Sequence, residues 1–186
     1  MKQPLNRSSI MGKGAGKELQ ARSGIPHFEA YELDSVTSKD RVYSFYQTYE
    51  ELPLFDVRLQ LYEDNGEITS YQQAYVEVES GVDQKEQKLI SAQLAVRSLV
   101  ENYLSEGSII TDVRLGYHGQ LYNSQTQPMF PHWRVTIDNG DIYYLQAFNG
   151  AVEPPQRGSD FLPFGPQDFQ PGNLNAKPTV NKEKSK

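Results

Sequence analysis

The 186-residue sequence contains no cysteine, which excludes a disulfide framework, a thiolate nucleophile and a cysteine-ligated metal site. It also has no apolar run near the roughly 20 residues that cross a bilayer, and no apolar stretch of the secretory-signal kind at its start. Apolar residues make up 37% of the chain, against a usual value of roughly 45–50%. This shortfall indicates that part of the chain lies outside a packed core.

Charge is distributed unevenly along the sequence. Residues 1–22 carry five basic side chains against one acidic side chain, and residues 154–186 carry five against three. Because the whole chain has a net charge of −6, residues 23–153 hold a net charge of −12. This acidic body argues against nucleic acid as the main partner, since phosphate binding needs a basic surface.

The two ends also lack the apolar periodicity of a folded domain. The last 33 residues hold six of the eleven prolines, and the first 22 show no sustained pattern. Neither end can bury enough apolar surface to offset its chain entropy. We therefore expect a basic flexible segment over 1–22, one folded domain over 23–153 and a proline-rich tail over 154–186.

Two Asn-Gly pairs, at 65–66 and 139–140, predict β-hairpins, because a type I′ turn needs positive φ at both central residues. A two-residue first loop would pair residues whose numbers sum to 131. The odd-numbered apolar residues from Phe55 to Leu61 then share one face, with Ser70 and Gln72 as polar exceptions. The second hairpin would pair residues summing to 279, such as Val135 with Tyr144, and a strand over 109–117 would precede it.

Helical spacing suggests two helices between the strands. One runs over about 38–51, where Val42, Phe45 and Tyr49 form a stripe that Pro53 ends. The other follows Asp83 and Glu86, which resemble a capping box, and Gly107 ends it. The predicted fold class is therefore α+β, with helices packed on one face of antiparallel hairpins. Its order is helix-β-β then helix-β-β-β, which also fits two related small units.

The sequence offers no catalytic constellation and no cofactor or metal site. The histidines, His27, His118 and His132, lack the spacing of a metal site, and His-based sites usually need three or four protein ligands. The glycines at 12–16 lack phosphate-loop spacing, and no G-x-S-x-G elbow is present. We therefore expect a protein that is not an enzyme.

The abundance of tyrosine, with twelve in the chain, is the one feature of the sequence that indicates a function. Tyr71 and Tyr75 are predicted on the face of the first hairpin opposite its apolar stripe, with Tyr62 nearby. Tyrosine is common in protein interfaces because it covers area at low entropic cost. These three residues are the candidates for partner binding, and cross-strand packing on an exposed sheet face is the alternative.

Several motifs together resemble the YycI family. They are LPLFD at 52–56, LYEDNGEITSYQQAYVEV at 61–78, KLISA at 88–92, ITDV at 110–113, Gly116-Tyr117, WRV at 133–135 and YYLQAFNGAVE at 143–153. The last block also resembles the end of a PepSY domain, a small extracytoplasmic α+β module.

The YycI resemblance implies a regulator of the WalK–WalR two-component system of Gram-positive bacteria, which governs cell-wall metabolism. Such proteins act with the related YycH protein on the sensor histidine kinase WalK by protein–protein contact. Family members are anchored to the membrane by an N-terminal helix and lie on its extracytoplasmic face, whereas no such helix is expected in this sequence. The PepSY-like block alone would instead imply an inhibitor or chaperone of a secreted hydrolase.

Overall fold

The computed structural model describes Ile10 and residues 24–79, 88–119, 128–157 and 170–173. Strand accounts for 53% of the structure, so the protein is mainly β. A short 3₁₀ turn, Phe28–Ala30, leads into the first sheet. This sheet contains β1 (Tyr31–Lys39), β2 (Val42–Tyr49), β3 (Leu52–Asp64), β4 (Glu67–Gln73) and β9 (Gln170–Asn173), and all its neighbours are antiparallel.

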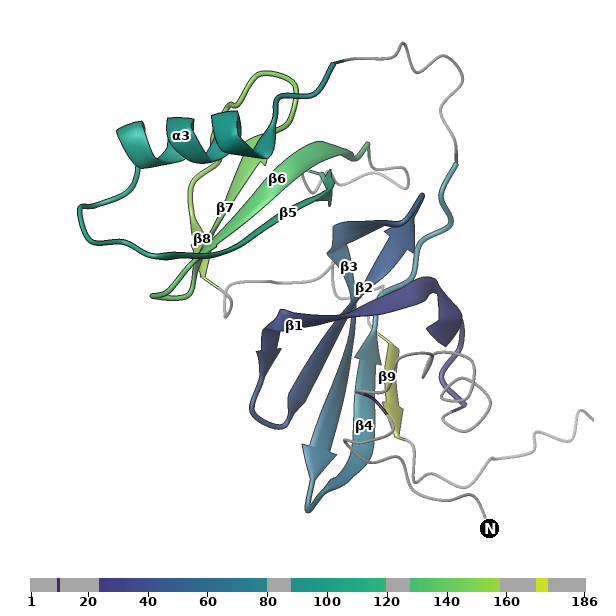
Figure 1. Ribbon diagram of the computed structural model, residues 1–186. Helices are drawn as coiled ribbons and strands as arrows, with labels where there is room; N and C mark the ends of the chain where they lie inside the picture. The colour runs from purple at the N-terminus through teal and green to yellow at the C-terminus, as the bar shows by residue number, and fades with distance from the viewer. Residues whose placement is uncertain (1–9, 11–23, 80–87, 120–127, 158–169, 174–186) are drawn as a thin grey trace, which may run out of the picture.

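The second sheet continues the first through β3 to give one mixed sheet, its own four strands are antiparallel to one another, and it carries the helix of the described region. It contains β5 (Ile110–His118), β6 (Phe130–Ile137), β7 (Asp141–Gln146) and β8 (Gln156–Arg157). Helix α3 (Ala92–Asn102) lies across one face of this sheet (Figure 1). It buries Ala95 and Leu99 against Val135 and Leu145 of β6 and β7.

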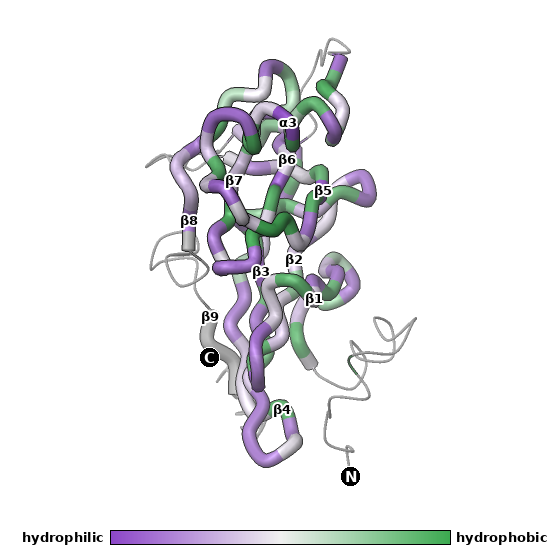
Figure 2. The backbone as a smooth tube through the Cα atoms, turned by 60° about the vertical axis from the view of Figure 1, so that its left-hand side comes forward, coloured by the Kyte–Doolittle hydropathy of each residue, from purple (hydrophilic) through white to green (hydrophobic). Residues whose placement is uncertain are grey.

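The long strand β3 joins the two sheets. Its C-terminal part pairs with β4, whereas Leu54 near its start pairs in parallel with Tyr117 of β5. Gly116 permits this close approach, because a Cβ there would lie 2.6 Å from the Phe55 ring and from the Pro53 carbonyl oxygen. The molecule is elongated, with α3 near one end and the β3–β4 hairpin at the other (Figure 2).

The helix predicted over 38–51 is wrong, and with it the helix-β-β order and the α+β class. The segment instead forms the end of β1 and the whole of β2, a strand that is buried from Tyr43 to Gln47. Half of the eight residues of β2 are aromatic, and aromatic residues favour strands. The turns on either side were missed because Arg41, Glu50 and Glu51 adopt positive φ without glycine.

The second predicted helix exists but is shorter than expected, because residues 88–91 are not helical and α3 runs only from Ala92 to Asn102, ending before Gly107. The Ser91 hydroxyl caps it by accepting a hydrogen bond of 3.3 Å from the Leu94 amide. The predicted capping residues, Asp83 and Glu86, lie outside the described residues.

The first hairpin starts in the predicted register and then shifts by one residue. Asp64 pairs with Glu67 and Glu63 with Ile68, but Tyr62 pairs with Ser70, which leaves Thr69 as a β-bulge. Beyond the bulge, Leu61 faces Tyr71 and Leu59 faces Gln73. The bulge removes the two polar exceptions, because Ser70 and Gln72 now lie opposite Tyr62 and Gln60.

The second hairpin differs from its predicted register by one residue throughout. Trp133 pairs with Leu145 and Val135 with Tyr143, because residues 138–140 form a three-residue loop. Gly140 has φ of +89° and donates a hydrogen bond of 2.9 Å to the Ile137 carbonyl. The side chains of Val135, Tyr143 and Leu145 therefore share the face that α3 covers.

The predicted C-terminal tail contributes backbone to both sheets. Strand β8 pairs with β7, and β9 pairs with β4. Almost all of the predicted N-terminal segment and most of the C-terminal tail lie outside the described residues. The three-part division of the chain stays a prediction.

Candidate functional site

Buried polar side chains gather where the second sheet meets the first. The face of β6 that points away from α3 carries His132, Arg134 and Thr136, and all three are buried. Strand β5 adds His118 and Asp112, and β3 adds Asp56. We refer to the groups around Arg134 and His118 as the junction cluster.

Arg134 is the cation at the centre of this junction, and its side chain is fully buried. Its guanidinium donates to Asp112 of β5 at 2.9 Å and also to Asp34 of β1 in the other sheet. The guanidinium carbon lies 5.0 Å from the centre of the Phe55 ring, within cation–π range. Burial alone would lower the pKa of Arg134, but its bond to Asp34 raises it above the usual value. Arg134 therefore stays charged and ties the two sheets together.

His118 forms the second part of the junction cluster. Its Nδ1 lies 3.0 Å from the Asp56 carboxylate, and its Nε2 lies 3.1 Å from Glu153, which follows β7. The ring stacks on Tyr144 with a centroid distance of 4.0 Å. His132 approaches the same Glu153 carboxylate at 3.5 Å, while its Nδ1 donates to the Phe130 carbonyl at 2.8 Å.

The two carboxylates decide the charge of His118. Burial alone would lower the pKa of His118, but the hydrogen bonds to Asp56 and Glu153 outweigh it and raise the pKa to about 9. The hydrogen bonds from His118 and His132 in turn lower the pKa of Glu153 to about 2, against a smaller opposing effect of burial. Near neutral pH the centre of the cluster is therefore an imidazolium held between two carboxylates.

This arrangement suits structural ion pairing better than catalysis. A general base must be unprotonated near the working pH and must reach a substrate, whereas His118 is protonated and only 5% exposed. Among the described residues, no group of three or more histidine or acidic side chains is placed to hold a metal ion. His27, the third histidine, lies elsewhere and stacks on Tyr75 with a centroid distance of 4.1 Å.

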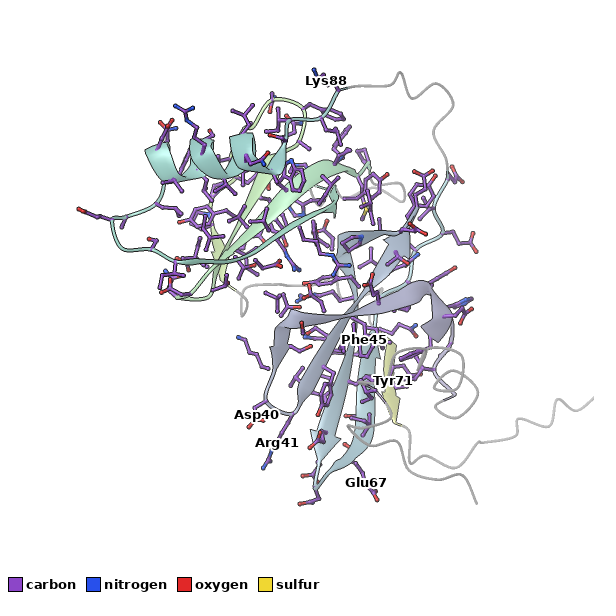
Figure 3. The ribbon with its side chains drawn as sticks, viewed as in Figure 1. Asp40, Arg41, Phe45, Glu67, Tyr71 and Lys88 are labelled. Atoms are coloured by element: carbon purple, nitrogen blue, oxygen red, sulfur yellow. The ribbon has the colours of Figure 1, made fainter. Side chains whose placement is uncertain are left out.

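The three candidate partner-binding tyrosines do not share one face. Tyr62 is half-buried and its hydroxyl donates to the Gln72 amide oxygen at 2.6 Å. Tyr71 lies on the opposite side of the sheet, because the Thr69 bulge turns it toward the core that contains Phe45 and Leu61 (Figure 3). Tyr75, which follows β4, is 40% exposed. Of the three, Tyr75 is the most exposed, whereas Tyr62 and Tyr71 are partly buried.

Sequence reasoning missed Asp34, Asp56, Arg134 and Glu153 as members of the junction cluster. Arg134 carried a usable signal, since a charged residue inside a strand with apolar residues on both faces needs a buried counter-charge. Its counter-ion Asp34 is 100 positions away in the sequence, and no spacing rule connects the two.

Comparison with known families agrees with the sequence motifs. The family model of the YycI protein matches residues 2–148, which is most of the chain. The chain belongs to the YycI family. YycI proteins are a regulatory family associated with the membrane-linked WalK two-component system. No curated protein sequence matches the chain, and no helix among its described residues is long and apolar enough to span a bilayer.

Proposed function

We propose that this YycI chain is a non-enzymatic regulator of a WalK-type sensor histidine kinase in cell-wall control. It acts by protein–protein contact, together with a YycH-like partner, on the extracytoplasmic face of the membrane. The observation that carries this proposal is the family match over residues 2–148. A regulator of this kind changes kinase activity by binding one signalling state more tightly than the other.

The junction cluster supports a contact function. Its ionised groups are used to hold the two sheets in one arrangement, and the buried imidazolium of His118 has no proton-accepting role near neutral pH. A fixed arrangement of two sheets offers a preorganised surface, which lowers the entropic cost of binding a partner.

The surface around Tyr75 is the proposed contact. Tyr75 is 40% exposed and so is Val78, three residues further along the same segment. The Gln47 side chain fixes this segment, because its amide donates to the Val76 carbonyl at 2.8 Å and accepts from the Val76 amide at 3.0 Å. Tyr75 is therefore presented on ordered backbone.

A binding titration of the purified chain against the soluble domain of its YycH-like partner tests this function. We expect saturable binding with micromolar or tighter affinity, a free energy of about −8 kcal/mol or better. Absence of binding by a folded sample would contradict the proposal.

Paired tyrosine variants then locate the contact. Tyr75→Ala is expected to weaken binding at least tenfold, since interface tyrosines often dominate binding energy. Tyr103→Ala is the matched control. Tyr103 is the C-cap residue of α3, its side chain is 53% exposed, and it lies away from this surface. Equal affinities of the two variants would remove Tyr75 from the contact. Tyr71→Ala is unsuitable, because Tyr71 packs on the core.

A further inference from the structure

The outer edge of β4 is covered by a strand of poor strand-forming sequence. Ser70 to Gln73 pair on one side with β3 and on the other with β9, whose sequence is Gln-Pro-Gly-Asn. Proline cannot donate a ladder hydrogen bond, and glycine weakens a strand because it loses more backbone entropy on ordering. Figure 1 shows β9 beside β4 at the margin of the first sheet.

The backbone pairing of β9 is short. Within the described part of the chain it pairs with β4 alone, along four residues, whereas β5 and β6 pair along almost their whole length. It also lies well past residue 148, where the family match ends. The β4 edge thus belongs to the family-matched region, and the strand that covers it does not.

When β9 leaves, the β4 edge becomes a template for another strand, because its backbone N–H and C=O groups then need new partners. A second copy of the chain is a poor occupant. In an antiparallel pairing of two β4 strands, the acidic turn with Asp64 and Glu67 of one copy would run toward Glu77 and Glu79 of the other. All four of these side chains are exposed, and their like charges oppose such a dimer.

We propose that the β4 edge is a docking site for an extended, neutral-to-basic strand of another protein, and that β9 is a weak cap that this strand displaces. The inference rests on the proposed function in taking that other protein to be the YycH-like partner. Side chains alternate along β4, with Tyr71 and Gln73 toward the core and Ser70 and Gln72 on the other face. The docked strand is therefore amphipathic, with a basic residue beside the acidic β3–β4 turn.

A reversible cross-link tests the proposal directly, because the chain has no cysteine of its own to interfere. Ser70→Cys with Asn173→Cys joins a residue pair of β4 and β9. In the oxidised form, the affinity for the YycH-like domain is expected to fall at least tenfold, and reduction is expected to restore it. The two single-cysteine variants are the controls and should bind as the unmodified chain does.

An unchanged affinity of the oxidised form would overturn the docking site while leaving the proposed function intact. If neither the unmodified chain nor any variant binds the YycH-like domain, the proposed function fails. In that case, hydrogen exchange of the unmodified chain still tests whether β9 is easily displaced from the β4 edge. The β4 amides that face β9 are expected to exchange at least tenfold faster than those that face β3. Equal protection of the two sets would show that β9 is not displaceable and would overturn the inference.

Discussion

The two Asn-Gly hairpins have nearly identical turn sequences, Asp-Asn-Gly-Glu at 64–67 and Asp-Asn-Gly-Asp at 138–141, but they form different turns. In the first, Asn65 and Gly66 both adopt positive φ, of 52° and 82°. In the second, Gly140 adopts positive φ and Asn139 does not. The Asn139 side chain instead accepts a hydrogen bond of 2.9 Å from the Asp141 amide.

The surroundings of each hairpin account for this difference. The β6–β7 hairpin is packed on both faces, by α3 on one and by the junction cluster on the other. A two-residue turn would shift the pairing of this hairpin by one position. Val135, whose side chain faces α3, would then pair with Tyr144, whose side chain faces the junction cluster. The β3–β4 hairpin keeps the two-residue turn and corrects its register with the Thr69 bulge near the turn. The same dipeptide thus predicts a hairpin, whereas packing chooses its register.

The largest effect is expected where the second hairpin is anchored to the first sheet. Arg134→Met removes the partner of Asp34 and leaves this carboxylate buried without its counter-ion. We expect the free energy of unfolding to fall by about 3–5 kcal/mol, measured by chemical denaturation. Arg97→Met is the control, because its ion pair with Glu101 on α3 is exposed, and we expect a change within about 1 kcal/mol. Similar losses for the two variants would refute the anchoring role of Arg134.

The second prediction concerns pH. The pKa of His118 is raised to about 9, so its contribution to stability is complete below the unfolded pKa of about 6.5 and is lost as pH rises through 9. The free energy of unfolding should fall by roughly 3 kcal/mol over this range. His118→Gln should abolish this fall, measured by denaturation at several pH values. A slope that persists in the variant would assign the titration to another group.

The smallest predicted effects are changes in stability when Asn65 and Asn139, the corresponding residues of the two turns, are substituted. Asn65→Ala should destabilise the protein by about 1 kcal/mol, because alanine is strained at positive φ, and Asn65→Gly should be nearly neutral. At Asn139, alanine and glycine should both cost roughly 0.5–1 kcal/mol, since either loses the side-chain hydrogen bond to Asp141. Thermal unfolding of the four variants tests this. If glycine were nearly neutral at both positions while alanine destabilised both, the two turns would be alike.

Sequence reasoning was most successful where the signal was local. The hairpins at 65–66 and 139–140 and the helix leading to Tyr103 are present, and the YycI resemblance is confirmed. It failed over 38–51, where Val42, Phe45 and Tyr49 fit a helical stripe but lie in β2. A strand buried on both faces shows no alternation, so hydrophobic periodicity cannot distinguish it from a buried helix.

The junction cluster shows the limit of sequence reasoning for the candidate site. Sequence reasoning considered His118 and His132 only as metal ligands, for which their spacing is wrong, and it did not assign Asp56, Glu153 and Arg134 to any site. The three candidate tyrosines were predicted to share one face, but the single-residue bulge at Thr69 places Tyr71 on the other side of the sheet from Tyr62. A one-residue change of register reverses every side chain beyond it.

The sequence by itself determined the family, the positions of the two hairpins, the presence of the main helix and the absence of cysteine chemistry, because each depends on residues that are close together or on composition. Only the tertiary structure decided the register of each hairpin, the strand identity of β2 and the pairing of Arg134 with Asp34. These features depend on which faces become buried against segments distant in the sequence. Burial carries a larger free energy than local preference, so packing overrides propensity where the two disagree.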